Sequence, residues 1–187
     1  MKRQIIIHSP AKFFRWVALL LTCALTLSGC LSDKVKNETV KNKDIVRKAF
    51  EKWANAEGSF FDLLAEDVVW TITGNSPVSK KYTSKKQFIE EVIDPLNEKF
   101  SRKIMPSLRG LYADGDMVIA LWHGKAVVKD GLPYDNTYSW YMKMKDGKII
   151  EVIAFFDTIE FTKLWNRISA PVSQMGQTKI DRNSQQK

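Results

Sequence analysis

Three Asp-Gly dipeptides, evenly spaced by sixteen residues, constrain the fold of this chain more than any other feature. They are Asp114-Gly115, Asp130-Gly131 and Asp146-Gly147, and the segments between them are rich in Val, Ile, Trp, Tyr and Met. Asp-Gly between apolar runs is typical of a β-hairpin, because a type I′ turn needs positive φ at both central residues. The pattern therefore predicts four antiparallel strands in a meander, over residues 104–113, 116–129, 132–145 and 148–158.

Strands of this length do not form a flat sheet, so the predicted meander must twist and curl. Gly124, in the middle of the second strand, is the expected bend point. A curled sheet has a concave face that must be filled. The function of the chain then depends on whether side chains alone fill this hollow or whether a ligand shares it.

The start of the chain has the organisation of a lipoprotein leader. Residues 1–15 carry four basic residues and no acid, and a twelve-residue apolar run follows from Trp16 to Leu27. This run is too short to span a bilayer and is typical of a secretory signal peptide. The tetrapeptide LSGC, which ends at Cys30, resembles the bacterial lipobox, in which the Cys is diacylated. We expect a signal peptide over residues 1–29 and a lipidated Cys30; the alternative is an ordinary signal peptide with an incidental Cys.

A lipidated Cys30 predicts a cell-envelope protein that its acyl chains hold at a membrane. Leu31 and Ser32 follow the cysteine, whereas lipoproteins retained in the inner membrane usually have Asp at this place. By this resemblance, the expected location is the outer membrane, facing the periplasm, if the organism is Gram-negative.

Removal of the leader excludes several kinds of site from the mature chain. Cys23 and His8 leave with it and Cys30 is acylated, so His123 is the only histidine and no free thiol remains. Zinc sites built from His and Cys, and a cysteine nucleophile, are therefore excluded. The formal charge of +8 falls to +4 from Cys30 onward. Without a stripe of Arg and aromatic residues, this charge predicts no nucleic-acid partner.

The mature chain divides into three parts. Residues 30–43 are polar and rich in Lys and Asn, as expected of a tether. Residues 44–168 carry the apolar patterns of one folded domain, and the polar residues 169–187 are expected to be a disordered tail.

Helical spacing of apolar residues predicts a helix over 44–55 and a short one over 161–168. Ser84 opens another predicted helix, which Asp94-Pro95 interrupts. Residues 68–73 are β-branched and aromatic, which favours a strand. Helices followed by antiparallel strands favour an α+β fold with helices packed on one face of a sheet.

Alternation along the strands assigns one set of side chains to the concave face. The candidate pocket residues in this set are Trp70, Trp122, Asn136, Tyr138, Trp140 and Phe156. Ordinary core packing is the alternative explanation for the tryptophans. Asn is disfavoured in strand interiors and needs a partner when buried, so Asn136 either binds a ligand carbonyl or is satisfied near the start of its strand.

Asp157 is the candidate general base. A carboxylate at the mouth of an apolar pocket has a raised pKa and takes up a proton near neutral pH. Its strand phase, out of step with Phe156, favours the alternative of a carboxylate at the rim or surface.

Several stretches together carry a resemblance to a known family. The DVVW strand, GDMVIALWHG, YDNTYSWYMKMKDGKI and IAFFDT, with the helices before them, resemble the SnoaL-like group of the nuclear-transport-factor-2-like superfamily over residues 44–165. The resemblance implies an α+β, cone-shaped roll, in which a strongly curved, mostly antiparallel sheet wraps around helices and leaves an apolar pocket. Members include ketosteroid isomerase and limonene-epoxide hydrolase as well as non-catalytic binding modules, so the fold alone does not assign a function.

The catalytic positions implied by this resemblance hold mostly inert side chains here. Ile72 occupies the place of the general base of ketosteroid isomerase, and Phe50 the place of its oxyanion-hole tyrosine. The protonated Asp of that enzyme falls near Tyr138, which can still donate a hydrogen bond. The His and Asp of polyketide-cyclase members align with Val152 and Ala154.

Three functions remain as hypotheses. The first is a lipid-anchored protein whose pocket binds a small apolar molecule, with Asn136 and Tyr138 holding a carbonyl or hydroxyl. The second is a cofactor-free acid–base enzyme, of isomerase, cyclase, dehydratase or hydrolase type, with Asp157 as base. The third is an interaction module that forms a homodimer through exposed sheet positions such as Leu121 or His123. None of them implies a metal or an organic cofactor.

Overall fold

The computed structural model describes residues 34–167, and the structural statements below concern this part of the chain. The predicted signal peptide over 1–29, the lipidated Cys30 and the tail over 169–187 lie outside the described residues. Among residues 34–167, no helix is both long and apolar enough to cross a membrane.

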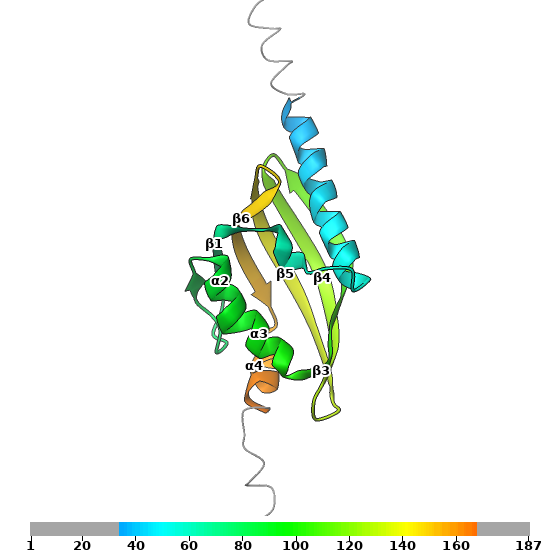
Figure 1. Ribbon diagram of the computed structural model, residues 1–187, viewed down its shortest axis with the longest axis vertical. Helices are drawn as coiled ribbons and strands as arrows, with labels where there is room; N and C mark the ends of the chain where they lie inside the picture. The colour runs from blue at the N-terminus through cyan, green and yellow to red at the C-terminus, as the bar shows by residue number, and fades with distance from the viewer. Residues whose placement is uncertain (1–33, 168–187) are drawn as a thin grey trace, which may run out of the picture.

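A six-stranded curved sheet organises the domain, in the order β2-β1-β6-β5-β4-β3 (Figure 1). The strands are β1 (Leu64–Ile72), β2 (Lys81–Tyr82), β3 (Phe100–Asp114), β4 (Met117–Val128), β5 (Pro133–Lys145) and β6 (Lys148–Phe156). The meander from β3 to β6 is antiparallel throughout, as the Asp-Gly spacing predicts. β1 pairs with β6 in parallel, with Trp70 opposite Val152, so the first strand lies beside the last.

Only one of the three Asp-Gly turns has the predicted type I′ conformation. At this turn Asp146 and Gly147 both have positive φ, 50° and 77°. The first turn is Gly115-Asp116 with positive φ at Gly115 alone (56°), which is the pattern of a type II′ turn. The second is a four-residue connection with positive φ at Gly131 alone (84°). Each hairpin still depends on a glycine at a positive φ.

The helices lie on the concave side of the sheet (Figure 1). A long N-terminal helix covers residues 34–54. The shorter helices are η1 (Phe60–Leu63), α2 (Lys85–Phe88), η2 (Ile89–Ile93), α3 (Asp94–Glu98) and α4 (Thr158–Arg167). The predicted interruption at Asp94-Pro95 is a change of helix type, because the π-helical η2 runs directly into α3, whose first turn tolerates a proline.

Residues 34–43, predicted as part of a tether, are instead the first turns of the N-terminal helix. Two polar side chains attach them to the first hairpin turn. The Gly115 N–H donates to Thr39 Oγ1 at 2.9 Å, and Asn42 Nδ2 donates to the Gly115 carbonyl at 3.3 Å. Asn42 is buried in this contact. The polar composition that favoured a tether therefore includes the residues that dock the helix.

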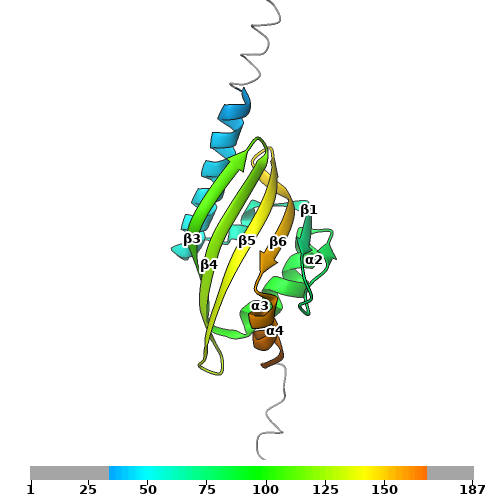
Figure 2. The ribbon, with the colours of Figure 1, turned by 180° about the vertical axis from the view of Figure 1, so that it is seen from behind.

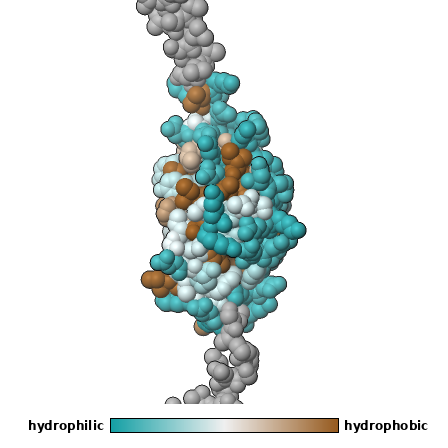
Figure 3. Space-filling model, turned by 90° about the vertical axis from the view of Figure 1, so that its left-hand side faces the viewer, coloured by the Kyte–Doolittle hydropathy of each residue, from teal (hydrophilic) through white to brown (hydrophobic). Residues whose placement is uncertain are grey.

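The strand phases predicted for the concave face are confirmed. Side chains of this phase in β1, β4, β5 and β6 are buried or half-buried, and they form one core with the helices. No helix within residues 34–167 covers the opposite face of β3 to β6 (Figure 2). From the side, the surface is mostly hydrophilic with apolar patches near its middle (Figure 3). The predicted α+β roll, with a curved sheet wrapped around helices, is therefore confirmed.

Candidate functional site

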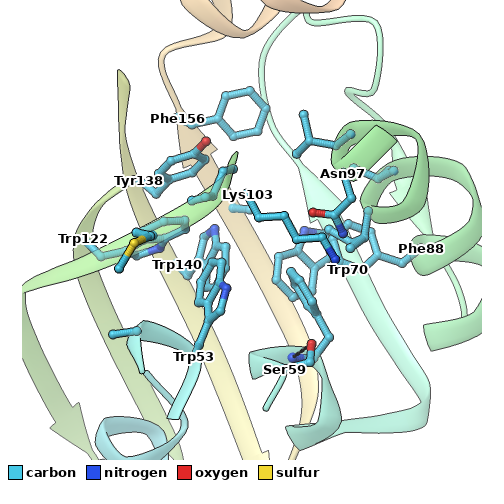
Figure 4. Close-up of a pocket in the computed structure, with 18 of the residues that line it drawn as sticks. Trp53, Ser59, Trp70, Phe88, Asn97, Lys103, Trp122, Tyr138, Trp140 and Phe156 are labelled. Carbon is cyan, nitrogen blue, oxygen red and sulfur yellow. Dashed lines mark hydrogen bonds between the residues drawn. The ribbon is translucent and has the colours of Figure 1, made fainter. Parts of the chain in front are cut away.

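A cavity of about 540 Å³ lies between the concave face of the sheet and the helices (Figure 4). Its size falls within the range of small-molecule sites, about 300–1,000 Å³. Nine aromatic side chains line it: Trp53, Phe61, Trp70, Phe88, Trp122, Tyr138, Trp140, Phe156 and Phe161. The hollow of the sheet is thus open and strongly apolar.

Each wall of the cavity comes from a different element. Trp70, Trp122 and Trp140 come from β1, β4 and β5, while Trp53 lies in the last turn of the N-terminal helix and Phe88 ends α2. Trp70 stacks on Phe88, with ring centroids 4.2 Å apart and ring planes within 14°. Trp122 meets Trp140 edge to face, with centroids 4.7 Å apart at 71°. Such pairs stabilise the walls beyond the burial of their area.

Gly124 makes room for a second stacked pair, Trp122 and Tyr138. These residues are opposite each other on β4 and β5, and their ring centroids are 4.0 Å apart with planes within 7°. A Cβ on Gly124 would lie 3.0 Å from the Trp122 ring, 3.1 Å from the Tyr138 ring and 3.0 Å from Ile104. The residue predicted as a bend point is therefore one where ring packing excludes a side chain.

A chain of hydrogen bonds leads from Tyr138 away from the cavity. The hydroxyl oxygens of Tyr138 and Tyr134 are 2.9 Å apart, and Asn136 Nδ2 donates to the Tyr134 oxygen at 2.9 Å. Burial raises the pKa of Tyr134 to about 12 and raises the pKa of Tyr138 well above its ordinary value. Either hydroxyl can be the donor in the bond between the two tyrosines, and a hydrogen bond from Tyr138 to a guest requires that Tyr134 is the donor.

Asn136 is buried but is not part of the cavity lining, contrary to its prediction as a ligand-binding residue. Its amide nitrogen donates to the Tyr134 oxygen at 2.9 Å and to the Asp157 carbonyl at 3.0 Å. Its amide oxygen accepts from the Asp157 N–H at 3.0 Å. The alternative of a satisfied structural Asn therefore describes it, because both amide hydrogens already have protein acceptors.

Asp157, the predicted general base, also lies outside the cavity lining. Its side chain is exposed, and its Oδ1 accepts from the N–H groups of Ile159 at 2.9 Å and Glu160 at 3.1 Å. This is the geometry of an N-cap for α4, which starts at Thr158. The surface alternative weighed for Asp157 therefore fits its position.

The other five predicted pocket residues do line the cavity, namely Trp70, Trp122, Tyr138, Trp140 and Phe156. The aromatic residues that sequence analysis missed come from the helical segments: Trp53, Phe61, Phe88 and Phe161. Trp53, Phe88 and Phe161 belong to predicted helices, and the apolar spacing of these helices predicted that they pack on the sheet. The same spacing does not predict the cavity that remains between these side chains and the sheet.

Four of the positions that the family resemblance links to catalysis carry no titratable side chain here, and the fifth is Tyr138. Ile72 and Ala154 line the cavity, whereas Phe50 and Val152 are buried in the core. Two buried donors, Trp70 Nε1 and Trp122 Nε1, have no hydrogen-bond partner among the described residues.

The charged side chains of the cavity lining are Arg102 and Lys103, on β3. The pairing of β3 with β4 shifts register between Phe100 and Arg102, and again between Arg102 and Met105. As a result the four consecutive residues 102–105 all line the cavity, which regular alternation along a strand does not allow. This rim was not predicted, because alternation along the strand does not reveal the bulges.

His123 belongs to the outward strand phase, as predicted. Its Nε2 lies 2.5 Å from the Asp135 carboxylate and its Nδ1 lies 3.3 Å from Thr137 Oγ1.

Within residues 34–167, no three His, Cys, Asp or Glu side chains cluster closely enough to hold a metal ion.

Comparison with solved structures shows the same fold. An NTF2-like protein from Burkholderia thailandensis E264 is 19% identical with a TM-score of 0.56, over 66% of this chain and 95% of that one. TerC, co-crystallised with polyporic acid, is 18% identical with a TM-score of 0.56, over 67% and 98%. A protein from Jannaschia sp. CCS1, described as a SnoaL-like polyketide cyclase, is 19% identical with a TM-score of 0.56, over 72% and 95%.

At these identities the structural similarity establishes the fold and no more. No curated protein matches the sequence significantly. Residues 40–152, more than half of the chain, match the family of SnoaL-like domains. The protein therefore belongs to the SnoaL-like domain family.

Proposed function

We propose that the chain binds a small hydrophobic molecule in the cavity on the concave face of the sheet. The observation that carries this proposal is an open hollow of about 540 Å³ with nine aromatic side chains in its wall. Protein interiors are close-packed and contain few voids larger than a water molecule. An open hollow of this size is filled by water in the absence of a guest, and an apolar guest that displaces the water gains dispersion contacts with the rings.

The wall determines how a guest would be held. An apolar body gains about 25 cal/mol for each Å² that it removes from water. The Tyr138 hydroxyl offers one hydrogen bond to a carbonyl or hydroxyl of the guest, and the relay through Tyr134 and Asn136 orients it. A structural neighbour supports a guest of this kind, since TerC was crystallised with polyporic acid.

Native mass spectrometry of the full chain, purified from its own cells, tests the proposal. The matched variants are Ala54→Trp, which places a large ring in the cavity lining, and Asn55→Trp, which places the same ring on the adjacent exposed position. A small molecule that is carried by wild type and by Asn55→Trp, and lost in Ala54→Trp, supports the proposal. A chain without any guest that also takes up no apolar probe contradicts it.

The proposal includes a lipid anchor on Cys30 and a place in the cell envelope, in the outer membrane if the organism is Gram-negative. Its support is the LSGC sequence after an apolar run. Residue 34 is already helical, so few residues separate the anchor from the folded domain. The 34–54 helix is about 30 Å long, so the cavity residue Trp53 lies about that far from residue 34. Replacement of Cys30 by Ser should abolish labelling by palmitate and release the chain from membranes.

Acid–base catalysis is the second candidate function, favoured by the Tyr138 hydroxyl as a neutral hydrogen-bond donor for a carbonyl. The proposed binding function has more support, because the cavity lining contains no carboxylate and no histidine. Catalysis with Asp157 as base requires that Asp157→Asn abolishes turnover of the captured molecule while its binding persists. Unchanged turnover in that variant contradicts the role of Asp157.

A homodimer through the outer face of the sheet is the third candidate. Large hydrophobic side chains of the outward phase are exposed there, on all four strands of the meander: Tyr112, Leu121, Tyr141, Ile153 and Phe155. Exposed apolar clusters of this kind mark interaction surfaces. Sedimentation equilibrium of wild type and of Leu121→Lys tests it; a monomer at all concentrations contradicts it.

A further inference from the structure

The mouth of the cavity has charge of one sign. Arg102 and Lys103 line it, and none of the other lining residues is charged. The Lys103 side chain extends over the cavity toward the side of α3, where Asn97 lies (Figure 4). An apolar hollow with a cationic rim is chemically asymmetric, with rings in the wall and positive charge at one edge.

Some cations on the surface are already held in ion pairs. Lys48, Lys163 and Arg167 each form an ion pair with a carboxylate at 2.6–2.7 Å. Arg102 and Lys103 form no ion pair with any residue in the described part of the chain, 34–167. Both are therefore available to a charged group that enters from outside.

The backbone of β3 puts these cations at the rim. With regular alternation, one of two consecutive residues would face the cavity and the next would face away. The register shifts on either side of Arg102 bring Arg102 and Lys103 to the same wall. The bulges thus build the cationic edge and at the same time interrupt the pairing of the strand.

We propose that the guest of this cavity is a small organic anion, with an apolar body among the rings and a carboxylate, sulfonate or phosphate group at Arg102 and Lys103. The inference rests on the proposed binding function and adds the chemical class of the ligand. A guanidinium binds a carboxylate through two parallel hydrogen bonds, a lysine adds a point charge, and the Asn97 amide is a further donor at the same mouth. A neutral guest would leave both cations solvated by water and would gain nothing from them.

The test compares two fluorescent probes that share one apolar body, anilinonaphthalene sulfonate and uncharged phenylnaphthylamine. Both are titrated into the full chain. The rim variant is Arg102→Gln with Lys103→Gln. The matched control is Arg109→Gln with Lys129→Gln, which removes the same two residue types from exposed positions outside the cavity lining.

Wild type and the control should bind the sulfonate probe about tenfold more tightly than the neutral probe, since hydrogen bonds to charged groups are the strong ones. The rim variant should lose this preference while its affinity for the neutral probe is unchanged. The preference of wild type should also weaken as salt is added, because the rim is exposed. Displacement of the sulfonate probe by naphthalene carboxylate or by decanoate supports the inference. Which of the two displaces it better shows whether the cavity prefers a guest with rings or one with a straight chain.

Equal binding of both probes by wild type, or equal loss of the preference in the rim variant and the control, overturns the inference and leaves the proposed function standing. Binding of neither probe contradicts the proposed function and the inference together. The two failures are therefore distinguishable in one set of titrations.

Discussion

Asn136 and Asp157 hold each other through a reciprocal pair of hydrogen bonds, from the Asn136 amide to the Asp157 carbonyl and from the Asp157 N–H to the Asn136 amide oxygen, each 3.0 Å long. The pair ties β5 to the start of α4. α4 in turn contributes Phe161 to the cavity wall. Two residues predicted to act on a ligand therefore act on the backbone, and they position one wall of the site.

Removal of this pair should destabilise the domain. Asn136→Ala leaves the Asp157 N–H and carbonyl without their side-chain partner and removes one of the two hydrogen bonds at the Tyr134 hydroxyl, which costs on the order of 2–3 kcal/mol. Urea unfolding measures the loss, and hydrogen exchange should show faster opening of α4. The exposed Asn55→Ala is the control and should change the free energy of unfolding by less than about 0.5 kcal/mol. Intact stability with selective loss of probe binding would restore Asn136 as a ligand contact.

Asp157 should behave as a helix cap in a series of two substitutions. Asn caps a helix as well as Asp, whereas Ala does not, so Asp157→Ala should lose on the order of 1 kcal/mol and Asp157→Asn much less. Thermal or urea unfolding of both variants separates them. An equal loss of stability in both variants would show that Asp157 stabilises the domain through its charge and not through the helix cap.

Addition of a single methyl group at Gly124 should destabilise the domain. The added Cβ of Gly124→Ala meets two stacked rings and Ile104 at 3.0–3.1 Å, and overpacking of this kind costs about 1–3 kcal/mol. Ile104→Ala removes one of the three contacts, so the double variant should be less destabilised than the sum of the single variants. Simple additivity in this double-mutant cycle would mean that the two side chains do not share the space.

The buried phenols should make the domain sensitive to alkali. The pKa of Tyr134 is raised to about 12 in the folded state, against an unfolded value of about 10. Below about pH 10 the phenol is neutral in both states; between about pH 10 and 12 the unfolded chain loses its proton first, so the free energy of unfolding falls. This shift in pKa corresponds to a decrease in the free energy of unfolding on the order of 3 kcal/mol once the pH exceeds both values.

Urea unfolding at about pH 9 and about pH 11 measures this effect. Tyr134→Phe should reduce the decrease, while Tyr112→Phe, at an exposed position, should leave it as in wild type. The same decrease in all three proteins would contradict the assignment to Tyr134.

Much of the fold was predictable because it rests on local chemistry. Glycine at a positive φ marks each hairpin, and the period-two alternation along β4 and β5 reports burial directly, so Trp122, Tyr138 and Trp140 were placed correctly.

What escaped prediction depends on contacts between distant segments. Thr39 and Asn42 hold residues 34–43 of the N-terminal helix against Gly115. The polar sequence of this segment does not predict that contact. The cationic rim depends on two register shifts in β3, which alternation cannot reveal. Asn136 was recognised as an unusual buried residue, but its partner Asp157 is fixed only by the pairing of β5 with β6.

A fluorescence titration with phenylnaphthylamine, on wild type, Ala54→Trp and Asn55→Trp, tests most directly whether the cavity holds an apolar guest. We expect saturable binding with one affinity for wild type and Asn55→Trp, and at least about tenfold weaker binding for Ala54→Trp, whose new ring occupies the space of the guest. The same affinity in all three proteins, or no binding to wild type, would contradict a guest-binding cavity.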